Sequence, residues 1–596
     1  MFWILLLQLS QFFIPSKPYN EQHRLQRISN DTTHVPRSNQ EMMTYSAYSF
    51  HPCYRLCRRG DRRTCYFNIV VDSFYTKADC GNCPKNMTDC FRPHCVTTDG
   101  VPTEFLAYNY QLPGPILSVC EGDTIIIHVT NYLSEMTTIH PHGMTMWATP
   151  YMDGVPYVSQ YPINPFQTFV QNFLADRSGS LWYHSHVGSQ RGFGLFGAFI
   201  IRVPDELNPM KRFYDIDSNR HVIVLCDWPI NFNATILNIL VNGKGHDQKR
   251  EYDPPVYAQF NVIQSKRYRF RVIFAGTASC SLEFSIQYHT LLLISVDGND
   301  IEAIKISSFV IMPAQRFDFV LTANQKVDNY WIQVRGLTGC APMVNGAVLH
   351  YEGASNALPK ESLMNEVPEG IQVNTLDAVN LDNPKQKPVY TLNALIKKYP
   401  VPVKCKIYLT MDFIISGGVF TARINKISGT SPTVSVTHAK DYIQDNYFCN
   451  KTSLKNDGLD CESSLCKCRH TINLPRNTFC EIFMVNEMTI QHPMHLHGFI
   501  FRVVGAGKLS AEERKDIQNV DYAKPFPRRQ EGAPLVDVVQ LPSTGYTIIW
   551  VYTNNSGYWL FHCHIEGHML AGMQLLFKVG EAKDMIPVPK PSLTCL

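Results

Sequence analysis

Neither charge nor long apolar runs dominate this chain. Its 54 Lys and Arg nearly balance its 51 Asp and Glu, the formal net charge is +3, and 18% of the residues are charged. Such a balance favours neither a nucleic acid nor an acidic partner. Beyond residue 14 no segment offers the roughly 18 uninterrupted apolar residues that a bilayer requires. We therefore expect no transmembrane span.

The one long apolar run lies at the very start, at residues 2–14 (FWILLLQLSQFFI). It has the length of the apolar part of a signal peptide and is too short to cross a membrane. We expect a signal peptide at 1–16, a variable polar leader at 17–50 and a secreted, extracellular protein. An anchored or cytosolic form is the alternative.

Long segments with a helical period of 3.6 residues are also missing. Short β-branched and aromatic runs take their place, separated by Gly, Pro, Asn and Asp. An all-β assembly of sandwich domains follows. The predicted strands are Tyr66–Ser73, Thr124–Asn131, Gly197–Val203, His221–Cys226, Lys266–Phe274, Arg316–Thr322, Tyr330–Arg335, Phe501–Gly505, Thr547–Thr553 and Met573–Val579.

Cysteine, by contrast, is plentiful, with 19 residues. Setting Cys563 aside leaves an even number, which can pair fully in an oxidising compartment. One dense group falls at 53–95, with Cys120 as a further candidate, and a second at 449–480. Cys80-Gly-Asn-Cys83 alone would also fit half a zinc site, but in a secreted chain disulfides are the better interpretation. Glycosylation sequons stand at Asn30, Asn86, Asn233, Asn450 and Asn554.

Histidine is scarce, with 21 residues, yet it gathers around one informative segment, residues 559–573 (WLFHCHIEGHMLAGM). Cys563, His568 and Met573 supply a thiolate, an imidazole and a thioether, the ligand types of a blue-copper site with a weak axial Met. If the segment is a strand, His562 and His564 point to the face opposite Cys563. A second metal site on that opposite face would then be joined to the first by covalent bonds.

Three other clusters supply seven more imidazoles. They are His140-Pro-His142, His184-Ser-His186 and His492-Pro-Met-His495-Leu-His497, which bring the total to twelve possible ligands in four clusters. A single His-X-His pair is commonly just part of a strand. A structural zinc site closes at about four ligands, and ten histidines with one thiolate exceed that number. Several copper ions fit the set better.

The order of these clusters resembles the multicopper oxidases, with the greatest similarity to their insect laccase-like branch. The resemblance also rests on Pro113-Gly-Pro115, on Cys120-Glu-Gly-Asp123, on Tyr151–Val155 and on Leu240–Gly245, and runs from about His51 to Val579. A histidine cluster followed by a His-X-His strand occurs at 140–186 and again at 495–564, with a histidine-poor middle. The resemblance implies three consecutive cupredoxin-like Greek-key β-sandwich or barrel domains, with the first and third facing each other across a shared copper cluster.

The boundaries that we expect follow from this repeat. They are a Cys-rich segment at 51–96 leading into the first domain, domains at 97–205, 206–357 and 384–580, a linker at 358–383 and a C-terminal tail at 581–596.

The resemblance further implies four copper ions: one type 1, one type 2 and a type 3 pair. Type 1 copper would be held by His492, Cys563 and His568, with Met573 as the weak axial ligand. Type 2 copper would take His140 and His495, and the type 3 pair His142, His184 and His564 on one ion and His186, His497 and His562 on the other. Asp153 and Glu566 match acidic positions beside the oxygen site, and we expect them to assist proton transfer and ligand orientation. A turn-forming Asp153 and a solvent-facing Glu566 are the alternatives.

The function expected from these features is a secreted, monomeric, laccase-like oxidase. It would oxidise small phenolic donors, such as diphenols and aminophenols, with O2 as acceptor. A ferroxidase or ascorbate oxidase would use the same copper ions, and a ferroxidase would need carboxylates near type 1 copper; Asp227, Glu283 and Asp537 are candidates that the sequence cannot place. A copper-binding secreted glycoprotein without catalysis is the alternative of another class.

Overall fold

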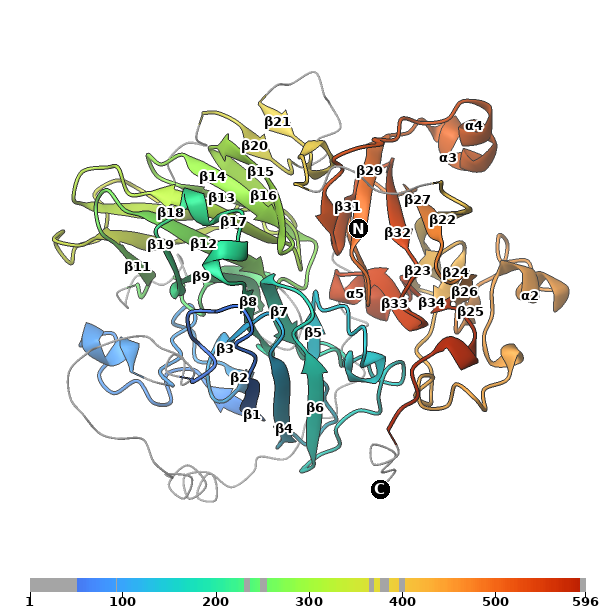
Figure 1. Cartoon of the computed structure of the whole chain (residues 1–596), viewed down its shortest axis with the longest axis horizontal. Helices are drawn as coiled ribbons and strands as arrows, with labels where there is room; N and C mark the ends of the chain where they lie inside the picture. Colours follow the sequence, from blue (N-terminus) through green and yellow to red (C-terminus); the bar gives the residue numbers. More distant parts are fainter. Residues whose placement is uncertain are drawn as a thin grey trace.

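The computed structural model describes residues 51–92, 94–229, 236–246, 255–363, 369–375, 385–395 and 402–589. The predicted signal peptide and leader lie outside these ranges, as does part of the predicted linker. Within them, strands form six sheets in three pairs along the chain (Figure 1). The all-β prediction is confirmed.

The first pair of sheets takes in the Cys-rich segment, because strand β1 is the centre of its first sheet. Strand orders are β2-β1-β4-β6 and β3-β8-β7-β5. Alternate residues of β4 are buried, which explains how its sequence TIIIHVTN covers a core on one face. The strands are β1 (Thr64–Tyr75), β2 (Glu104–Tyr108), β3 (Gly114–Cys120), β4 (Thr124–Asn131), β5 (His140–His142), β6 (Thr168–Leu174), β7 (Gly179–His184) and β8 (Phe196–Arg202).

The middle pair of sheets has the orders β10-β9-β12-β17-β14-β15 and β11-β19-β18-β13-β16-β20-β21. Phe284 of one sheet lies 5.7 Å from Phe319 of the other, ring centre to ring centre. The strands are β9 (Ile216–Pro229), β10 (Ile236–Val241), β11 (Ala258–Val262), β12 (Arg267–Phe274), β13 (Cys280–Ile286), β14 (Leu291–Val296), β15 (Asn299–Ile306), β16 (Ser308–Ile311), β17 (Arg316–Thr322), β18 (Asn329–Thr338), β19 (Val344–Tyr351), β20 (Gln372–Val373) and β21 (Gln386–Lys387). Strand β20 belongs to the predicted linker and pairs with β16, so this part of the linker extends the middle sheet.

The last pair has the orders β25-β24-β23-β22-β27-β32-β29-β30 and β26-β34-β33-β28-β31. Its strands are β22 (Cys405–Ser416), β23 (Val419–Ile424), β24 (Ile427–Gly429), β25 (Cys466–Cys468), β26 (Thr471–Leu474), β27 (Phe479–Asn486), β28 (His492–Leu496), β29 (Phe501–Lys508), β30 (Leu535–Val536), β31 (Val538–Leu541), β32 (Gly545–Tyr552), β33 (Gly557–Cys563) and β34 (Gln574–Val579).

Helices are short and lie between strands. The α-helices are α2 (Lys451–Asn456), α3 (Ala511–Lys515), α4 (Ile517–Ala523) and α5 (Glu566–Leu570). The 3-10 helices are η2 (Met87–Phe91), η3 (Pro150–Met152), η4 (Asp205–Leu207), η5 (Lys211–Phe213), η6 (Val389–Thr391), η7 (Asp445–Tyr447) and η8 (Ala582–Asp584). Among the described residues no helix is long and apolar enough to cross a bilayer.

All ten predicted strand runs overlap a strand of the structure. Two of them, Thr124–Asn131 and Arg316–Thr322, have the predicted bounds. The run Tyr66–Ser73 extends to β1, because its ends find further pairing with β2 and β4.

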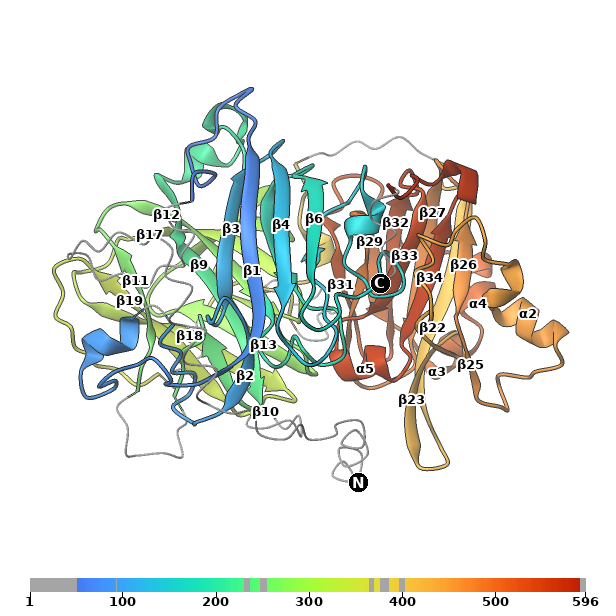
Figure 2. The same cartoon turned by 90° about the horizontal axis from the view of Figure 1, so that it is seen from below.

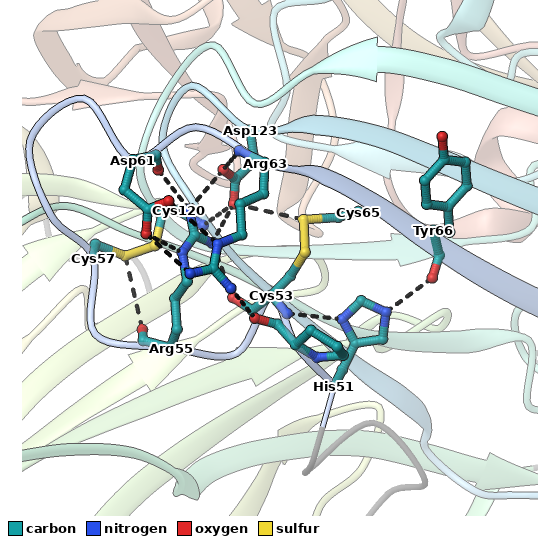
Figure 3. The surroundings of a disulfide bond; sticks show 11 residues. His51, Cys53, Arg55, Cys57, Asp61, Arg63, Cys65, Tyr66, Cys120 and Asp123 are labelled. Atoms are coloured by element: carbon teal, nitrogen blue, oxygen red, sulfur yellow. Dashed lines mark hydrogen bonds and ion pairs between the residues drawn. A yellow bond between two sulfur atoms is a disulfide. The ribbon is translucent and has the colours of Figure 1, made fainter.

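Disulfides fasten the Cys-rich segment to the first domain. Cys53–Cys65 and Cys57–Cys120 flank Arg55, whose guanidinium donates to both carboxylate oxygens of the buried Asp123, at 2.8 and 2.9 Å (Figure 3). The remaining disulfides are Cys80–Cys95, Cys83–Cys90, Cys280–Cys340, Cys449–Cys468 and Cys461–Cys466.

The expected full pairing of the remaining cysteines is not what the structure shows. In the described residues Cys226, Cys405 and Cys480 are thiols, besides Cys563. The sequence groups Cys480 with the cysteines at 449–468. In the structure it is buried on β27, opposite Cys405 of β22. Strand register, rather than closeness in sequence, decides its neighbour.

Candidate metal centres

The predicted ligands gather into four groups, in each of which the ligand atoms lie within 4.8 Å of one another. The groups are His140, His142 and His495; His142, His184 and His564; His186, His497 and His562; and His492, Cys563 and His568. The first three share or adjoin residues and are called the multi-histidine cluster below, and the fourth is called the Cys563 cluster. The structure therefore brings together all ten predicted histidines and Cys563, and their role as ligands stays a prediction.

Strand edges of the first and third domains build the multi-histidine cluster. β5 and β7 place His140 opposite His184, and β28 and β33 place His495 opposite His562. These edges face each other, with the ring of His142 5.1 Å from that of His564 (Figure 1). The domain contact that the resemblance implied thus brings the two halves of the cluster together.

Three rings of this cluster, those of His140, His142 and His495, have one nitrogen held by the protein and the other without a hydrogen-bond partner. Nδ1 of His140 donates to the carbonyl of Asp153 at 2.6 Å, and Nδ1 of His495 donates to the carbonyl of Asp537 at 2.8 Å. The Nε2 atoms of both rings are buried without a hydrogen-bond partner. His142 is the reverse, with Nε2 bonded to the Asp537 carboxylate at 3.1 Å and Nδ1 free. Buried nitrogens of this kind are costly unless a ligand completes them.

Burial also fixes the charge of these rings. It holds the pKa of His142, His184, His497, His562 and His564 well below the usual range, and the neighbouring cationic and histidine side chains add to the effect. The imidazoles are therefore neutral, which is the form that binds metal. The donor set fits copper ions.

The Cys563 cluster lies inside the third domain alone. The Sγ atom of Cys563 is 3.5 Å from Nδ1 of His492 and 3.6 Å from Nδ1 of His568, and these nitrogens are 3.2 Å apart. Burial raises the pKa of the Cys563 thiol to about 12 and lowers the pKa of His568 to about 3. One thiolate and two imidazoles in this arrangement match a trigonal blue-copper site.

Met573 lies next to this cluster through its backbone. Its N–H donates to the carbonyl of His568 at 2.9 Å, and its carbonyl accepts from the N–H of Cys563 at 3.1 Å. The side chain is fully buried. The role of its thioether as axial ligand stays a prediction.

Asp153 lies at the end of η3, between two rings of the multi-histidine cluster. Its carboxylate accepts from Nδ1 of His497 at 2.9 Å, while its carbonyl accepts from His140. A role in orienting ligands fits these contacts better than a simple turn residue.

Glu566 is buried at the start of α5, not solvent-facing. Burial raises its pKa to about 7, against the opposing effect of Arg191, whose Nε lies 3.4 Å away. Nη1 of Arg191 is also 2.5 Å from Nδ1 of His564, and Nη2 donates to the carbonyl of His564. No sequence pattern marks Arg191, because its contacts cross from the first domain to the third.

The three carboxylates considered for an iron site all have hydrogen-bond or ion-pair partners within the protein. Asp227 accepts from the N–H groups of Thr277 and Ala278, and Glu283 pairs with Arg335 in the middle domain. Asp537 lies beside the multi-histidine cluster, where its carboxylate is bonded to Nε2 of His142.

Known proteins resemble the chain over most of its length. Three family models, each described as "Multicopper oxidase", match residues 91–206, 227–354 and 431–583. Laccase-1 of Fomitopsis schrenkii is 33% identical over 516 residues, which cover 83% of this chain and 86% of that protein. Laccase-5 of Trametes villosa is 30% identical over 524 residues, covering 83% and 90%.

Solved structures agree with this result. The laccase from Botrytis aclada superposes with a TM-score of 0.70 at 25% identity, covering 92% of this chain and 94% of its own. Fet3p, titled a multicopper oxidase that functions in iron import, gives 0.67 at 22% identity over 89% and 94% of the two chains, and shows the fold alone. The predicted cupredoxin-like architecture is confirmed. These relatives do not test the resemblance to the insect branch. The chain belongs to the multicopper oxidases, copper-dependent oxidoreductases that use oxygen and bind four copper ions of types 1, 2 and 3.

Proposed function

We propose that the chain is a secreted laccase-like oxidase that takes single electrons from diphenol and aminophenol donors at the Cys563 cluster and reduces O2 to water at the multi-histidine cluster. His492, Cys563 and His568 would hold type 1 copper, with Met573 as a further, weak ligand. His140 and His495 would hold type 2 copper. The type 3 pair would be held by His142, His184 and His564 on one ion and by His186, His497 and His562 on the other.

The side chains around His568 support the proposed class of electron donor. The ring of His568 lies 4.8 Å from the ring of Phe413 and 6.4 Å from that of Phe420. Burial is the cause of the lowered pKa of His568. These ring contacts suit an aromatic donor.

The β22–β23 hairpin extends the apolar character of this edge. Ile415 and Val419 are 63% and 52% exposed near its tip, and Leu570 of α5 is 46% exposed. Figure 2 shows the hairpin projecting beyond the rest of the third domain, and β23 contacts α5, which carries His568. A small apolar ring would be held against this surface by burial of its faces.

The chemistry divides between copper and the chain's own residues. Copper, when bound, accepts electrons one at a time and supplies the four that dioxygen needs to become two waters. The backbone joins Cys563 directly to His562 and His564, so the two clusters are linked by covalent bonds. Asp153 orients His140 and His497. Glu566, with a pKa of about 7, holds a proton near neutral pH and can deliver it on the oxygen side.

Secretion is supported by the seven disulfides of the described residues, which persist in oxidising compartments. We also propose that the enzyme is a monomer, which light scattering on the purified protein tests.

Kinetics with a catechol, Fe(II) and ascorbate under identical conditions test the donor class. We expect the highest kcat/KM with the catechol. A higher value with Fe(II) or with ascorbate would replace the proposal by the corresponding oxidase. Binding of copper without turnover of any donor would instead support a copper-binding glycoprotein.

A further inference from the structure

The middle domain supplies no histidine to either cluster, yet one of its side chains contacts both neighbouring domains at the multi-histidine cluster. Arg316, the first residue of β17, is fully buried. Its Nε donates to the carbonyl of Ser180 in the first domain at 3.1 Å. Its terminal nitrogens donate to the carbonyls of Ala314 (3.1 Å) and Asp297 (3.2 Å) and to the carboxylate of Asp537 in the third domain. All five N–H donors of the guanidinium are thus used.

The pair formed with Asp537 is bidentate. Nη1 and Nη2 of Arg316 lie 2.6 and 2.5 Å from its two carboxylate oxygens. The same carboxylate accepts from Nε2 of His142, and the Asp537 carbonyl accepts from Nδ1 of His495. These two rings stack, with centres 4.0 Å apart. One residue therefore sets the direction of two rings from different domains.

The middle domain also holds the backbone at this point. Asp297 accepts from the N–H of Arg316 at 2.9 Å through one oxygen. Through the other it accepts from the N–H groups of Asp537 and Val538, at 3.3 and 3.1 Å. Both the side chain and the backbone of Asp537 are therefore fixed from the second domain.

We propose that Arg316 is a positioning residue of the multi-histidine cluster, acting through Asp537 on His142 and His495. It holds the rings so that Nδ1 of His142 and Nε2 of His495 stay directed to the metal side. The inference rests on the proposed copper ligands, and it gives the histidine-poor domain a direct part in building the oxygen site.

Arg316→Lys keeps the positive charge but removes the bidentate pair with Asp537. An ammonium group cannot make two parallel bonds to a carboxylate and still reach three carbonyls. Loss of such an outer partner lowers metal affinity about 10–100-fold. We expect this loss at the multi-histidine cluster, measured as copper per chain during chelator titration and as a changed type 2 signal in electron paramagnetic resonance. The blue absorption of the Cys563 cluster should stay, since all its ligands belong to the third domain.

Arg269→Lys is the matched control. Arg269 is also buried in the middle domain. Its Nη2 and Nε donate to Oδ2 of Asp318 at 2.6 and 3.0 Å, and Asp318 lies two residues after Arg316 in β17. The Arg269→Lys variant should keep four copper ions with unchanged affinity. Wild-type affinity in Arg316→Lys, or equal loss of copper from both clusters, would overturn the proposal.

A second variant, Asp297→Asn, tests the same proposal if Arg316→Lys does not fold. Asp297→Asn keeps the shape of the side chain but can turn amide N–H groups toward the N–H of Val538. A smaller loss confined to the multi-histidine cluster supports the proposal, and unchanged copper binding contradicts it. A wild-type protein without blue absorption would refute the proposed function itself, so the two failures are distinguishable.

The geometry also points, independently, to an eighth disulfide between Cys405 and Cys480. They are register partners on the parallel strands β22 and β27, and their side chains contact each other. Neighbouring strands lie about 4.8 Å apart, within the range of about 4.4–6.8 Å between Cα atoms that disulfides span. Cys405 is partly exposed, so one thiol is open to an oxidant.

The reaction is exchange with a small disulfide such as oxidised glutathione. The Cys405 thiol loses its proton and displaces one glutathione; the Cys480 thiol, losing its own, then displaces the second. Two protein thiols become a disulfide, and one oxidised glutathione becomes two reduced molecules.

Peptide mass mapping of the folded holoenzyme after this treatment tests the link. We expect a Cys405–Cys480 peptide in the wild type and in Cys226→Ser, which removes a buried thiol elsewhere, and none in Cys405→Ser. Persistence of both thiols in the wild type, shown by alkylation after denaturation, would overturn this second inference.

Discussion

The two metal centres differ in how the chain assembles them. The Cys563 cluster takes His492, Cys563 and His568 from β28, the end of β33 and α5, all in the third domain. The multi-histidine cluster forms where strand edges of the first and third domains meet. Arg316 of the second domain is hydrogen-bonded to both of these domains there. One centre needs a folded domain, whereas the other needs three domains docked in register.

This difference teaches where each centre is vulnerable. A change at a domain contact should empty the multi-histidine cluster and leave the blue centre intact. A change confined to the residues of the Cys563 cluster should do the opposite. The following variants test that separation.

The largest effect is expected from Cys563→Ser. A hydroxyl cannot replace the soft thiolate, so the blue band and the oxidation of every donor should vanish while copper stays at the multi-histidine cluster. Absorption, copper content and turnover measure the three effects, with Cys226→Ser as the matched control. Turnover of a phenol near the wild-type rate would show that Cys563 is not the ligand.

Glu566→Gln should slow the oxygen half-reaction about 100-fold while leaving reduction by the donor nearly unchanged, since a general acid contributes on that order. The pKa of Glu566 is raised to about 7, so its acid form prevails below pH 7 and is lost above it. The wild-type oxygen step should therefore slow as pH rises through 7, and the variant should lose this dependence. Stopped-flow measurement of both half-reactions decides, with the exposed Glu581→Gln as control. A defect confined to the donor step would contradict this role.

Phe413→Ala should raise the KM of a catechol about 3–10-fold, the size of one lost aromatic contact. The blue band and the oxygen half-reaction should not change, because the Phe413 ring lies against His492 and His568 of the Cys563 cluster and is not a ligand. An equal rise in KM for Fe(II) would show that the ring does not select aromatic donors.

The smallest effect is expected from Met573→Leu, which removes a weak axial bond. Copper loading should persist and the type 1 potential should rise. A redox titration without an upward change would mean that Met573 only fills the core, as buried methionines often do.

The spacing of the His and Cys residues marks the side chains that the structure brings together, whereas their division among the copper ions comes from the family resemblance. In β33 the alternation of strand side chains alone separates Cys563 from His562 and His564. The strands around them were predictable for the same reason, since their apolar patterns are local. Asp153 and Glu566 came only through resemblance to a family.

What could not be predicted depends on contacts between distant parts of the chain. Arg191 meets His564, and Asp537 meets His142, only after the domains dock. Arg316 reaches Asp537 in the same way, and no local pattern marks these contacts. The neighbour of Cys480 likewise follows from the parallel register of β22 and β27. Spacing reveals what one strand presents, but not what another domain brings to it.

The most direct test of two separately assembled centres is copper analysis of the purified protein together with its absorption spectrum. Four copper ions per chain, with a blue band from the Cys563 cluster and a near-ultraviolet shoulder from the multi-histidine cluster, are predicted. Four bound copper ions without the blue band and the shoulder would contradict the account.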